Sequence, residues 1–421
     1  MDTAAPVFPP KTAWESDGTS RIPFMAYTGA EQHRRELERL FYRKHWCYVG
    51  LEAEIPQPGD FTRTVIGERS VVMVRAADGA IHVVENVCAH RGMQFCRERH
   101  GNRKETGFTC PYHQWNYSLQ GDLQGVPFRR GVKQDGKVNG GMPADFKPAE
   151  HGLNQLRVAT RGGVVFASFD PDVESLEDFM GSAILGYFDR LFNGRKLTIL
   201  GYNRQRIPGN WKLMQENIKD PYHPGLLHTW FVTFGLWRAD NKSELKMDAH
   251  HRHAAMISTR GASGAAAQVT QVSSFKESMQ LHDPRFLDIV PEPWWGGPTA
   301  VMMTLFPSVI LQQQVNSVST RHIQPRGPGE FDFVWTHFGF EDDTPEMTQR
   351  RLRQANLFGP AGFVSADDGE VIELSQKGFE QKPFHRTLAE LGGREVADTD
   401  HMVTETLIRG MYAYWRRQME D

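Results

Sequence analysis

Two short motifs, each pairing a cysteine with a histidine, constrain the fold of this chain most strongly. Cys88 and His90 stand two residues apart, and Cys110 and His113 follow after an interval of 19 residues. Each motif can supply one thiolate and one imidazole from a single tight loop. Two such loops can hold a metal centre only if a compact framework brings them together. The sequence therefore predicts a small domain built around a metal centre.

Two kinds of centre use two cysteines and two histidines. Structural zinc sites usually place both cysteines in one loop and both histidines in the other. Here each loop is mixed, as in a Rieske [2Fe–2S] cluster, where a thiolate pair binds one iron and an imidazole pair binds the other. We therefore predict a Rieske cluster; a zinc site and four unrelated residues are the alternatives. Cys47 and Cys96 are not assigned as ligands.

The segment around these motifs has the composition of β-strands. Val71–Asn86 consists of two β-rich runs on either side of Asp78-Gly79, which predicts a hairpin. We predict an N-terminal arm and helix over residues 1–44, a mostly β domain over 45–160 and a larger α+β domain over 161–421. The larger domain is expected to contain an antiparallel sheet. Expected strands are Leu197–Ile207, Thr299–Gln314 and Glu330–Phe340; expected helices are 28–45, Ser175–Phe192, Trp211–Asn217, Pro345–Leu357 and Val403–Met419.

A second constellation lies in the larger domain. Asp220, His223 and His228 stand in the segment NIKDPYHPGLLHTW. On a regular helix, two residues five positions apart differ by about 140° and cannot share one metal ion. Pro221 and Pro224 break the helix here, so both imidazoles can turn toward one ion. Asp220 is close enough in sequence to contact a ligating imidazole.

Two histidines need a carboxylate to complete the facial triad of a non-haem Fe(II) oxygenase. Asp367 and Asp368 follow a Gly/Pro-rich turn and are expected on the helix after it. From chemistry alone either could be the ligand, and the alternative is an acidic pair that merely stabilises a helix start.

Composition excludes several classes of protein. The net charge is −3, so neither nucleic acid nor an anionic membrane is an expected partner. No apolar run reaches the roughly 20 residues of a membrane span, and the N-terminus has no signal peptide pattern. Four cysteines are consistent with a cytoplasmic protein.

The motifs HWCYVG, CAHRG, CPYHQWNY, ENIKDPYHPGLLH and FGPAGFVSADDGE together resemble the large (alpha) subunits of Rieske aromatic-ring-hydroxylating oxygenases. The resemblance implies a helix-grip-like catalytic domain beside a Rieske domain. It implies that Cys88 and Cys110 bind one cluster iron and that His90 and His113 bind the other. It also implies a mononuclear iron held by the three remaining ligands, which are His223, His228 and Asp368.

The resemblance further implies a role for Asp220, which matches the residue that connects the cluster of one subunit to the iron site of its neighbour. An α3β3 hexamer with a small beta subunit is therefore expected. Two positions depart from the family pattern. Gln114 occupies a position that is often small, and Asn217 is one residue closer to Asp220 than in naphthalene dioxygenase, so Asn217 is not assigned to the iron site.

Family members receive electrons from NAD(P)H through a reductase and a ferredoxin, which are expected partners, and they use O2. This chain has no dinucleotide fingerprint of its own. Its sequence is most similar to those of the members that convert salicylate to gentisate, and we expect this reaction. A dioxygenase for anthranilate or an ortho-substituted benzoate is the alternative, and a simple Rieske electron carrier is a third hypothesis.

The resemblance also suggests which residues contact an aromatic carboxylate. Met256, Phe358 and Val364 are candidates for the apolar wall, and Gln314 and Ser365 are candidates for polar contacts. Three arginines, Arg204, Arg206 and Arg321, can pair with a carboxylate, but strand alternation can equally place them on a solvated face.

Overall fold

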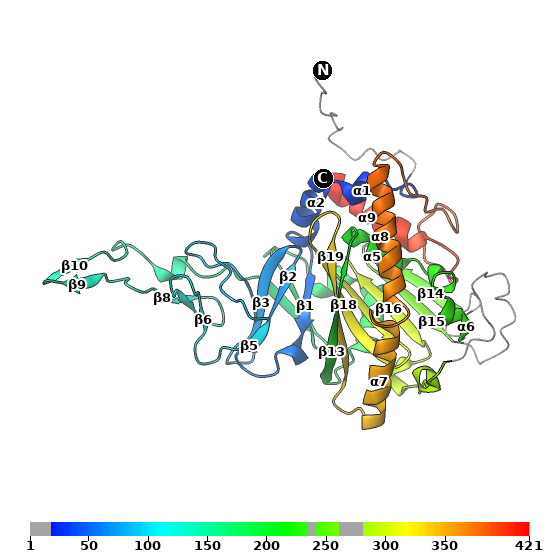
Figure 1. The fold of residues 1–421 in the computed structure, drawn as a ribbon, viewed down its shortest axis with the longest axis horizontal. Helices are drawn as coiled ribbons and strands as arrows, with labels where there is room; N and C mark the ends of the chain where they lie inside the picture. Colours follow the sequence, from blue (N-terminus) through cyan, green and yellow to red (C-terminus); the bar gives the residue numbers. More distant parts are fainter. Residues whose placement is uncertain (1–17, 235–240, 261–280, 421) are drawn as a thin grey trace, which may run out of the picture. The chain divides into compact units, whose positions relative to one another are not determined.

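The computed structural model describes residues 18–234, 241–260 and 281–420, so most of the predicted N-terminal arm lies outside the described residues. The chain divides into two compact units (Figure 1). One unit comprises Phe41–Glu174; the other combines the segment ending at Leu40 with the segment beginning at Ser175. None of the described helices is long and apolar enough to cross a membrane.

The unit Phe41–Glu174 is built almost entirely of short antiparallel strands. Its sheets have the strand orders β1-β12-β11, β4-β3-β2-β5, β6-β7-β8 and β10-β9. The strands are β1 (Cys47–Leu51), β2 (Asp60–Ile66), β3 (Arg69–Arg75), β4 (Ile81–Glu85), β5 (His100–Asn102), β6 (Phe108–Thr109), β7 (Asn116–Tyr117), β8 (Leu123–Gly125), β9 (Val132–Gln134), β10 (Lys137–Asn139), β11 (Arg157–Arg161) and β12 (Val164–Ser168). Two 3₁₀ turns, η2 (Glu52–Glu54) and η3 (Pro148–Glu150), complete the unit.

The predicted hairpin is present and joins β3 to β4. Gly79 has a φ of 88°, a conformation that glycine adopts without steric strain. The Asp78 carboxylate accepts a hydrogen bond from the Ala80 amide at 3.0 Å, which closes the turn. The hairpin ends at Glu85, three residues before the first Cys-His motif.

The predicted boundary at residue 161 is wrong. Strand β12 is fully buried and lies between β1 and β11 as the central strand of its sheet. Cys47 of β1 is opposite Ala167 of β12 in the register. Removing β12 from this unit would expose both neighbouring strands, so the boundary falls after Glu174.

The other unit is built on one antiparallel sheet with the strand order β13-β19-β18-β17-β16-β15-β14. Its strands are β13 (Leu197–Ile207), β14 (Lys242–Met247), β15 (Ala254–Thr259), β16 (Ala300–Leu305), β17 (Val309–Gln314), β18 (Ser317–Pro325) and β19 (Phe331–Phe340). The helices are α1 (Met25–Thr28), α2 (Ala30–Glu36), α3 (Leu176–Met180), α4 (Ser182–Leu191), α5 (Trp211–Lys219), α6 (Thr229–Thr233), α7 (Pro345–Phe358), α8 (Ser365–Gln381) and α9 (Thr406–Glu420). A π-helical turn, η1 (Leu37–Phe41), follows α2, and 3₁₀ turns occur at η4 (His223–Gly225), η5 (Pro284–Leu287) and η6 (Pro293–Trp295). Together with the β-rich unit, this confirms the predicted fold class.

Three predicted elements are interrupted in the structure. The expected strand 299–314 is a hairpin of β16 and β17, because Pro307 cannot donate to a sheet ladder. The expected helix 175–192 is divided at Gly181, which has a φ of 72°. The expected helix 28–45 begins earlier, is broken at Gly29, whose backbone is extended, and ends at Phe41.

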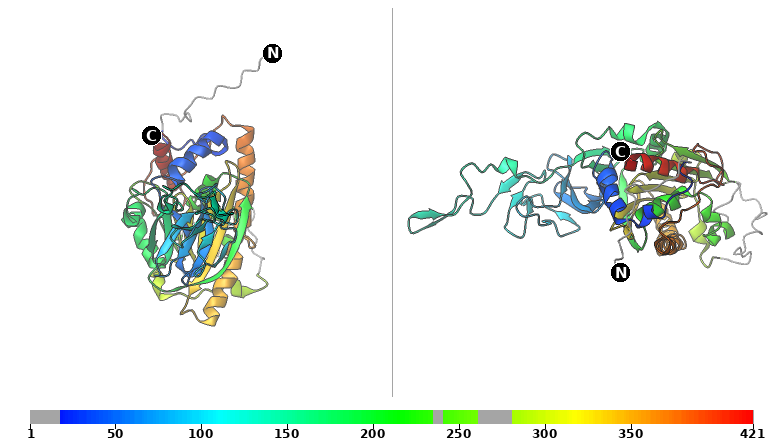
Figure 2. Two further views of the ribbon diagram at one scale, coloured as in Figure 1. Left: turned by 90° about the vertical axis from the view of Figure 1, so that its left-hand side faces the viewer. Right: turned by 90° about the horizontal axis from the view of Figure 1, so that it is seen from above.

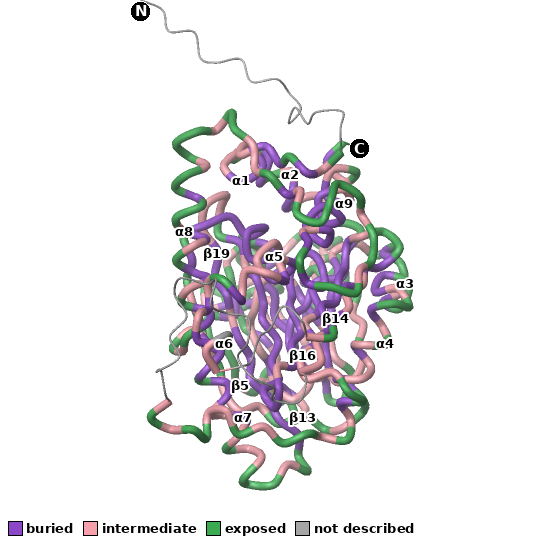
Figure 3. The backbone as a smooth tube through the Cα atoms, turned by 90° about the vertical axis from the view of Figure 1, so that its right-hand side faces the viewer, coloured by how far each residue is buried: buried purple, intermediate pink, exposed green. Residues whose placement is uncertain are grey.

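The two faces of the large sheet carry different helices. Arg190 of α4 donates to Gln313 on one face at 2.9 Å. Lys219 of α5 donates to Thr304 on the other face at 2.7 Å. The strands in Figure 3 are largely buried, which places the core of this unit along the sheet.

The first described helices belong to the unit that contains the large sheet, although we predicted a separate N-terminal segment. Glu36 of α2 is fully buried and accepts hydrogen bonds from Trp211, Lys212 and Trp415. Arg39 donates to the carbonyl of Gln418 at 2.8 Å, and α2 and α9 lie side by side in Figures 1 and 2. A buried carboxylate that loses such partners is strongly destabilising, so α2 is an integral part of this unit.

Candidate metal centres and cavity

The two Cys-His motifs form matching loops in the β-rich unit. The amide of Gly92 donates to the carbonyl of Cys88, and the amide of Gln114 donates to the carbonyl of Cys110, both at 2.9 Å. Each loop therefore closes four residues after its cysteine. The imidazole rings of His90 and His113 approach one another, with centroids 4.6 Å apart.

The two cysteines and the two histidines of these motifs differ in solvent exposure. Cys88 and Cys110 are each 2% exposed, whereas His90 is partly exposed and His113 is exposed. In the described part of the chain, only one group of three or more His, Cys, Asp or Glu residues converges tightly enough for a single ion, and it lies elsewhere. The four side chains are therefore not drawn together around one point in the described structure.

Two contacts of these loops bear on the cluster. The Tyr117 hydroxyl lies 3.1 Å from the Cys88 sulfur and accepts from the Ala89 amide at 3.2 Å. Gln114 has a φ of 58°, which is strained for a residue with a side chain. This strain explains why the family pattern often has a small residue where this chain has Gln114. Cys96 stands apart from the two loops: its thiol donates to the carbonyl of Glu98 at 3.5 Å, and burial raises its pKa to about 11.

The second constellation forms where helix α5 ends. Asp220 is the C-cap and has an extended backbone, and the chain then makes the turn η4 before α6 begins. The break brings His223 and His228 together, with ring centroids 5.4 Å apart. A continuous helix would have kept them on different faces. The proline-broken helix expected from the sequence is present.

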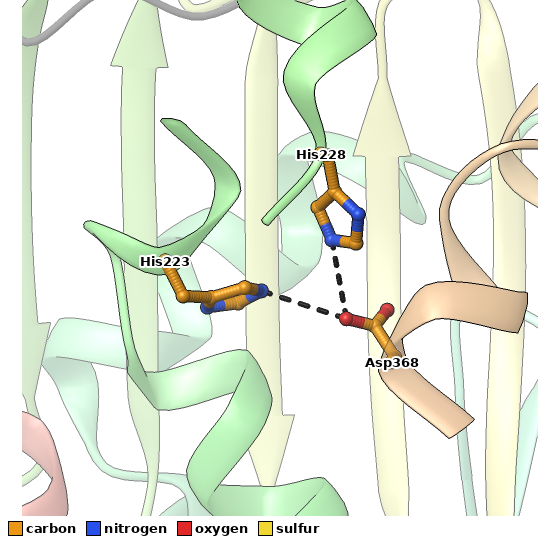
Figure 4. Close-up of side chains that lie close together, drawn as sticks. All are labelled: His223, His228 and Asp368. Atoms are coloured by element: carbon orange, nitrogen blue, oxygen red, sulfur yellow. Dashed lines mark ion pairs between the residues drawn. The ribbon is translucent and has the colours of Figure 1, made fainter. Parts of the chain in front are cut away.

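Helix α8 supplies the carboxylate that meets these imidazoles (Figure 4). Asp368 Oδ1 lies 3.6 Å from Nε2 of His223 and 3.1 Å from Nε2 of His228. Candidate ligand atoms of the three side chains lie within 4.8 Å of one another. Two imidazole nitrogens and one carboxylate form the donor set of a facial triad, so these residues fit a mononuclear iron.

The other nitrogen of each ring is already engaged. Nδ1 of His223 lies 2.8 Å from the backbone carbonyl of Asp220, and Nδ1 of His228 lies 3.2 Å from Oδ2 of Asp367. These partners set the orientation of the rings and leave both Nε2 atoms facing Asp368. The two adjacent aspartates therefore have different positions: Asp368 is 4% exposed and central, whereas Asp367 lies behind His228.

Asn217 was not expected in this site, but the structure places it there. Its amide donates to Asp368 Oδ1 at 3.0 Å, and its Oδ1 is buried without a hydrogen-bond partner among the described residues. It lies one helical turn before Asp220 on α5, and that helical spacing is the signal that could have identified it.

Asp220 contacts His223 through its backbone more closely than through its side chain. Its carboxylate oxygen lies 3.8 Å from Nδ1 of His223 and instead accepts from the amides of Tyr222 and His223, each at 3.2 Å. The carboxylate therefore also closes the turn between α5 and η4.

The carboxylates in this site stabilise positive charge on the imidazoles beside them. Burial lowers the pKa of His223, but the nearby carboxylates of Asp220 and Asp368 outweigh this effect and raise that pKa to about 9. Burial raises the pKa of Asp368, yet its bonds to His223 and His228 hold it below the usual range of a carboxylic acid. Asp368 is thus an anion in a site that also offers two imidazoles.

A cavity opens at these residues, between the sheet and the segment from α5 to η4. Three of the five predicted substrate contacts line it: Met256, Gln314 and Val364. The other two do not. Phe358 packs in a core cluster with Trp230. Ser365 is 1% exposed and donates to the side chain of Gln205 at 2.8 Å, because it points back toward β13.

The structure also separates the three arginines that the sequence left open. Arg204 and Arg206 alternate with less exposed residues on β13, and both are exposed. Arg206 is paired with Asp332 at 2.9 Å. Arg321 is 3% exposed and lines the cavity.

Comparison with known protein families assigns both units. Residues 45–135 match the model of the Rieske [2Fe-2S] domain, and residues 194–421 match that of the ring hydroxylating alpha subunit, catalytic domain. The domain pair implies a Rieske cluster and a mononuclear iron.

Individual relatives extend over almost the whole chain. The chain is 78% identical over 417 residues to the salicylate 5-hydroxylase large oxygenase component of Ralstonia sp, covering 99% of this chain and 98% of the relative. It is 40% identical over 406 residues to the anthranilate 1,2-dioxygenase large subunit of Burkholderia cepacia, covering 96% and 94%. Naphthalene 1,2-dioxygenase from Rhodococcus sp. bound to indole shares the fold, with a TM-score of 0.78 at 24% identity, covering 95% and 94%.

Proposed function

Because the chain belongs to the family of Rieske ring-hydroxylating oxygenase alpha subunits, we propose that it is the large oxygenase component of a system that converts salicylate to gentisate. The observation that supports salicylate as the substrate is the 78% identity to a salicylate 5-hydroxylase component over nearly the full chain. A catalytic domain with its own metal site also distinguishes the chain from a simple electron carrier.

The proposed metal ligands follow from the two donor sets. Cys88 and Cys110 bind one iron of the [2Fe–2S] cluster, and His90 and His113 bind the other. The proposal is supported by the matching loops and by the difference between the buried sulfurs and the more exposed imidazoles.

His223, His228 and Asp368 hold the mononuclear iron, which supplies the activation of O2 when bound. The carbonyl of Asp220 and the carboxylate of Asp367 keep the two Nε2 atoms directed at the metal position. The amide of Asn217 holds Asp368 in place.

The cavity beside this site receives the aromatic ring. Met256 and Val364 supply apolar wall, and Gln314 is only partly buried and supplies a polar contact. An apolar pocket with a few polar groups is the usual form of a site for a small aromatic ligand.

Partners follow from the proposed role. The name of the Ralstonia relative, a large oxygenase component, supports a multicomponent system with separate electron-transfer proteins, here a ferredoxin and an NAD(P)H-dependent reductase. We further propose an α3β3 assembly in the cytoplasm, in which Asp220 connects the cluster of one subunit with the iron site of the next.

Product analysis tests the substrate. The purified oxygenase, supplied with NADH, O2, ferredoxin and reductase, is given salicylate, anthranilate and 2-chlorobenzoate in parallel. Gentisate as the main product, with about three iron atoms per chain, supports the proposal. Preferential turnover of anthranilate or 2-chlorobenzoate would support instead the alternative of a dioxygenase for substituted benzoates.

A further inference from the structure

Helix α8 has a glycine directly after the proposed iron ligand Asp368. Gly369 is buried within the helix, although glycine is a poor helix former because it loses more conformational freedom on folding than alanine does. At Gly378, the next glycine of α8, an added methyl group would meet nothing within 4 Å. At Gly369 the methyl carbon would lie 2.5 Å from the side-chain nitrogen of Gln205. The glycine beside Asp368 therefore leaves room for one particular side chain.

The side chain that occupies this room belongs to Gln205 on β13 and is held at both ends of its amide. The nitrogen donates to the carbonyl of Ser365 at 2.9 Å, and the oxygen accepts from the hydroxyl of Ser365 at 2.8 Å. In an α-helix the carbonyl of one residue lies beside the residue four positions later, which here is Gly369. A larger residue at position 369 could fit only by pushing this amide away from Ser365.

The two hydrogen bonds attach the sheet to the first turn of α8. Val364, the N-cap residue, has an apolar side chain that cannot accept a hydrogen bond from the helix amides. Asp368 projects from this first turn toward the two imidazoles, which come from the separate segment after α5 (Figure 4). A shift of the turn would therefore move the carboxylate relative to the imidazoles, to which it now lies at 3.6 and 3.1 Å.

A second contact attaches α8 farther along the helix. The amide of Asn210 donates to the side chain of Gln376 at 3.0 Å, and Gln376 is 4% exposed. Gln376 lies about two helical turns beyond Asp368. Both glutamines thus bind α8 to the segment that runs from β13 into α5, but only Gln205 does so at the turn that carries the proposed ligand.

We infer that Gln205 is a positioning residue for the mononuclear iron: it fixes the first turn of α8 so that the carboxylate of Asp368 meets the two imidazoles, and Gly369 provides the space for this contact. The inference deepens the proposed function and rests on it in one respect, namely that Asp368 is an iron ligand. Gln205 is not among the described residues that line the cavity, so its effect passes through Asp368.

Fe(II) binding at equilibrium tests this role without turnover. The oxygenase with an intact cluster is dialysed against buffered Fe(II), and iron in excess of the cluster is measured, the cluster being quantified from its visible absorbance. EPR of the nitric oxide adduct of the bound Fe(II) reports the coordination geometry. The variants are Gln205→Ala, Gly369→Ala and the double variant, with Gly378→Ala and Gln376→Ala as matched controls. Thermal unfolding accompanies each measurement.

Gln205→Ala should weaken Fe(II) binding about 10-fold and change the EPR spectrum, because it removes a group that orients a ligand. Gly369→Ala should weaken Fe(II) binding to a similar extent, although alanine is the better helix former. The double variant should bind no more weakly than Gln205→Ala, because the methyl group then enters the space of the missing amide. Gly378→Ala should bind Fe(II) like wild type. Gln376→Ala should unfold at a lower temperature but keep wild-type Fe(II) affinity.

Wild-type Fe(II) affinity in Gln205→Ala would overturn the inference, as would additive losses in the double variant or an equal loss in either control. If Gln205→Ala does not fold, the comparison of Gly369→Ala with Gly378→Ala decides, and equal Fe(II) affinities would overturn the inference. Failure of the proposed function looks different. Asp368→Ala would then keep wild-type Fe(II) affinity, which would show that the ligand assignment is wrong and would overturn the inference with it.

Discussion

Nδ1 of His228 lies 3.2 Å from Oδ2 of Asp367, on the side of the ring opposite its contact with the metal-site carboxylate. His228 is 1% exposed, so this contact fixes the orientation of a ring that has little room to rotate. Two consecutive aspartates thus contact one histidine from opposite sides. Substituting each of them should affect iron binding to a different degree.

Asp368→Ala should abolish binding of the mononuclear iron and all hydroxylation, because it removes one of the three proposed ligands. The Rieske absorbance should persist, since the cluster residues belong to the other unit. Iron content per chain, visible spectrum and gentisate formation measure the three effects.

Asp367→Ala is the matched control at the neighbouring position. Removing a carboxylate that orients a ligating histidine typically lowers metal affinity 10- to 100-fold rather than abolishing it. The variant should regain activity when Fe(II) is added in excess. If Asp367→Ala is inactive at every iron concentration while Asp368→Ala works, the ligand assignment is wrong by one residue.

Tyr117→Phe should lower the reduction potential of the Rieske cluster. The Tyr117 hydroxyl lies 3.1 Å from the sulfur of Cys88, and a hydrogen bond to a ligating sulfur withdraws negative charge and favours the reduced state. A redox titration followed by visible spectroscopy measures the potential. An unchanged potential would show that this contact is not a hydrogen bond to the cluster ligand.

Gln114→Gly should stabilise the β-rich unit by roughly 0.5–1 kcal/mol, because glycine relieves a left-handed backbone conformation at φ 58°. Gln124→Gly on the exposed side of β8 is the control and should destabilise by a similar amount, since glycine weakens an ordinary strand. Denaturant unfolding of both variants measures whether each substitution raises or lowers the free energy of unfolding. Equal destabilisation would mean that position 114 carries no backbone strain.

Lys219 should make stability depend on pH. The side chain is 1% exposed, and burial lowers its pKa to about 7, well below that of an unfolded lysine. Between pH 7 and about 10.4 the unfolded chain binds a proton that the native chain does not, so stability rises with pH across this window. Below pH 7 both states are protonated, and the contribution no longer changes.

Lys219→Met should remove that rise, whereas Lys377→Met, at an exposed position on α8, should keep it. Urea unfolding midpoints at several pH values from 7 to 10 measure the slope. A variant of Lys219 with the wild-type slope would show that Lys219 stays charged in the folded protein.

Asp220→Asn should leave both metal sites occupied and slow electron transfer from cluster to iron. An asparagine oxygen can still accept from the amides of Tyr222 and His223, so the turn after α5 is kept. What is lost is the charge proposed to connect neighbouring subunits. Single-turnover oxidation of the reduced cluster, with salicylate and O2 present, measures the rate. A wild-type rate would eliminate the connecting role.

Local sequence signals were sufficient where one residue imposes the backbone. Asp78-Gly79 predicted the hairpin of β3 and β4, and the prolines after Asp220 predicted the break that brings His223 and His228 together. The fold class and the pairing of His223 with His228 could also be predicted, because ligand chemistry restricts which residue types converge on iron; Asp368 came from the family resemblance, since chemistry alone left it open against Asp367.

Signals of the same kind failed where pairing partners are distant in sequence. Strand β12 resembled the start of the larger domain, but its two neighbours in the sheet assign it to the β-rich unit. Glu36 likewise joins α2 to α5 and α9 through hydrogen bonds to residues that are distant in sequence; Trp211, for example, lies 175 positions away. Sequence pattern records which face of an element is apolar, not which element covers it.

The sequence by itself determined the chemistry of this protein: mixed Cys-His loops for a cluster, and two histidines with an aspartate for an iron. Residue chemistry could not choose between similar side chains, and the tertiary structure separates them. Asp368 and Asp367, or Arg321 and Arg204, have the same functional groups and plausible spacing, and they differ only in where the fold directs them. The physical reason is that a charge acquires its role from burial and from the partners around it, and both depend on strands and helices that meet far apart in the chain.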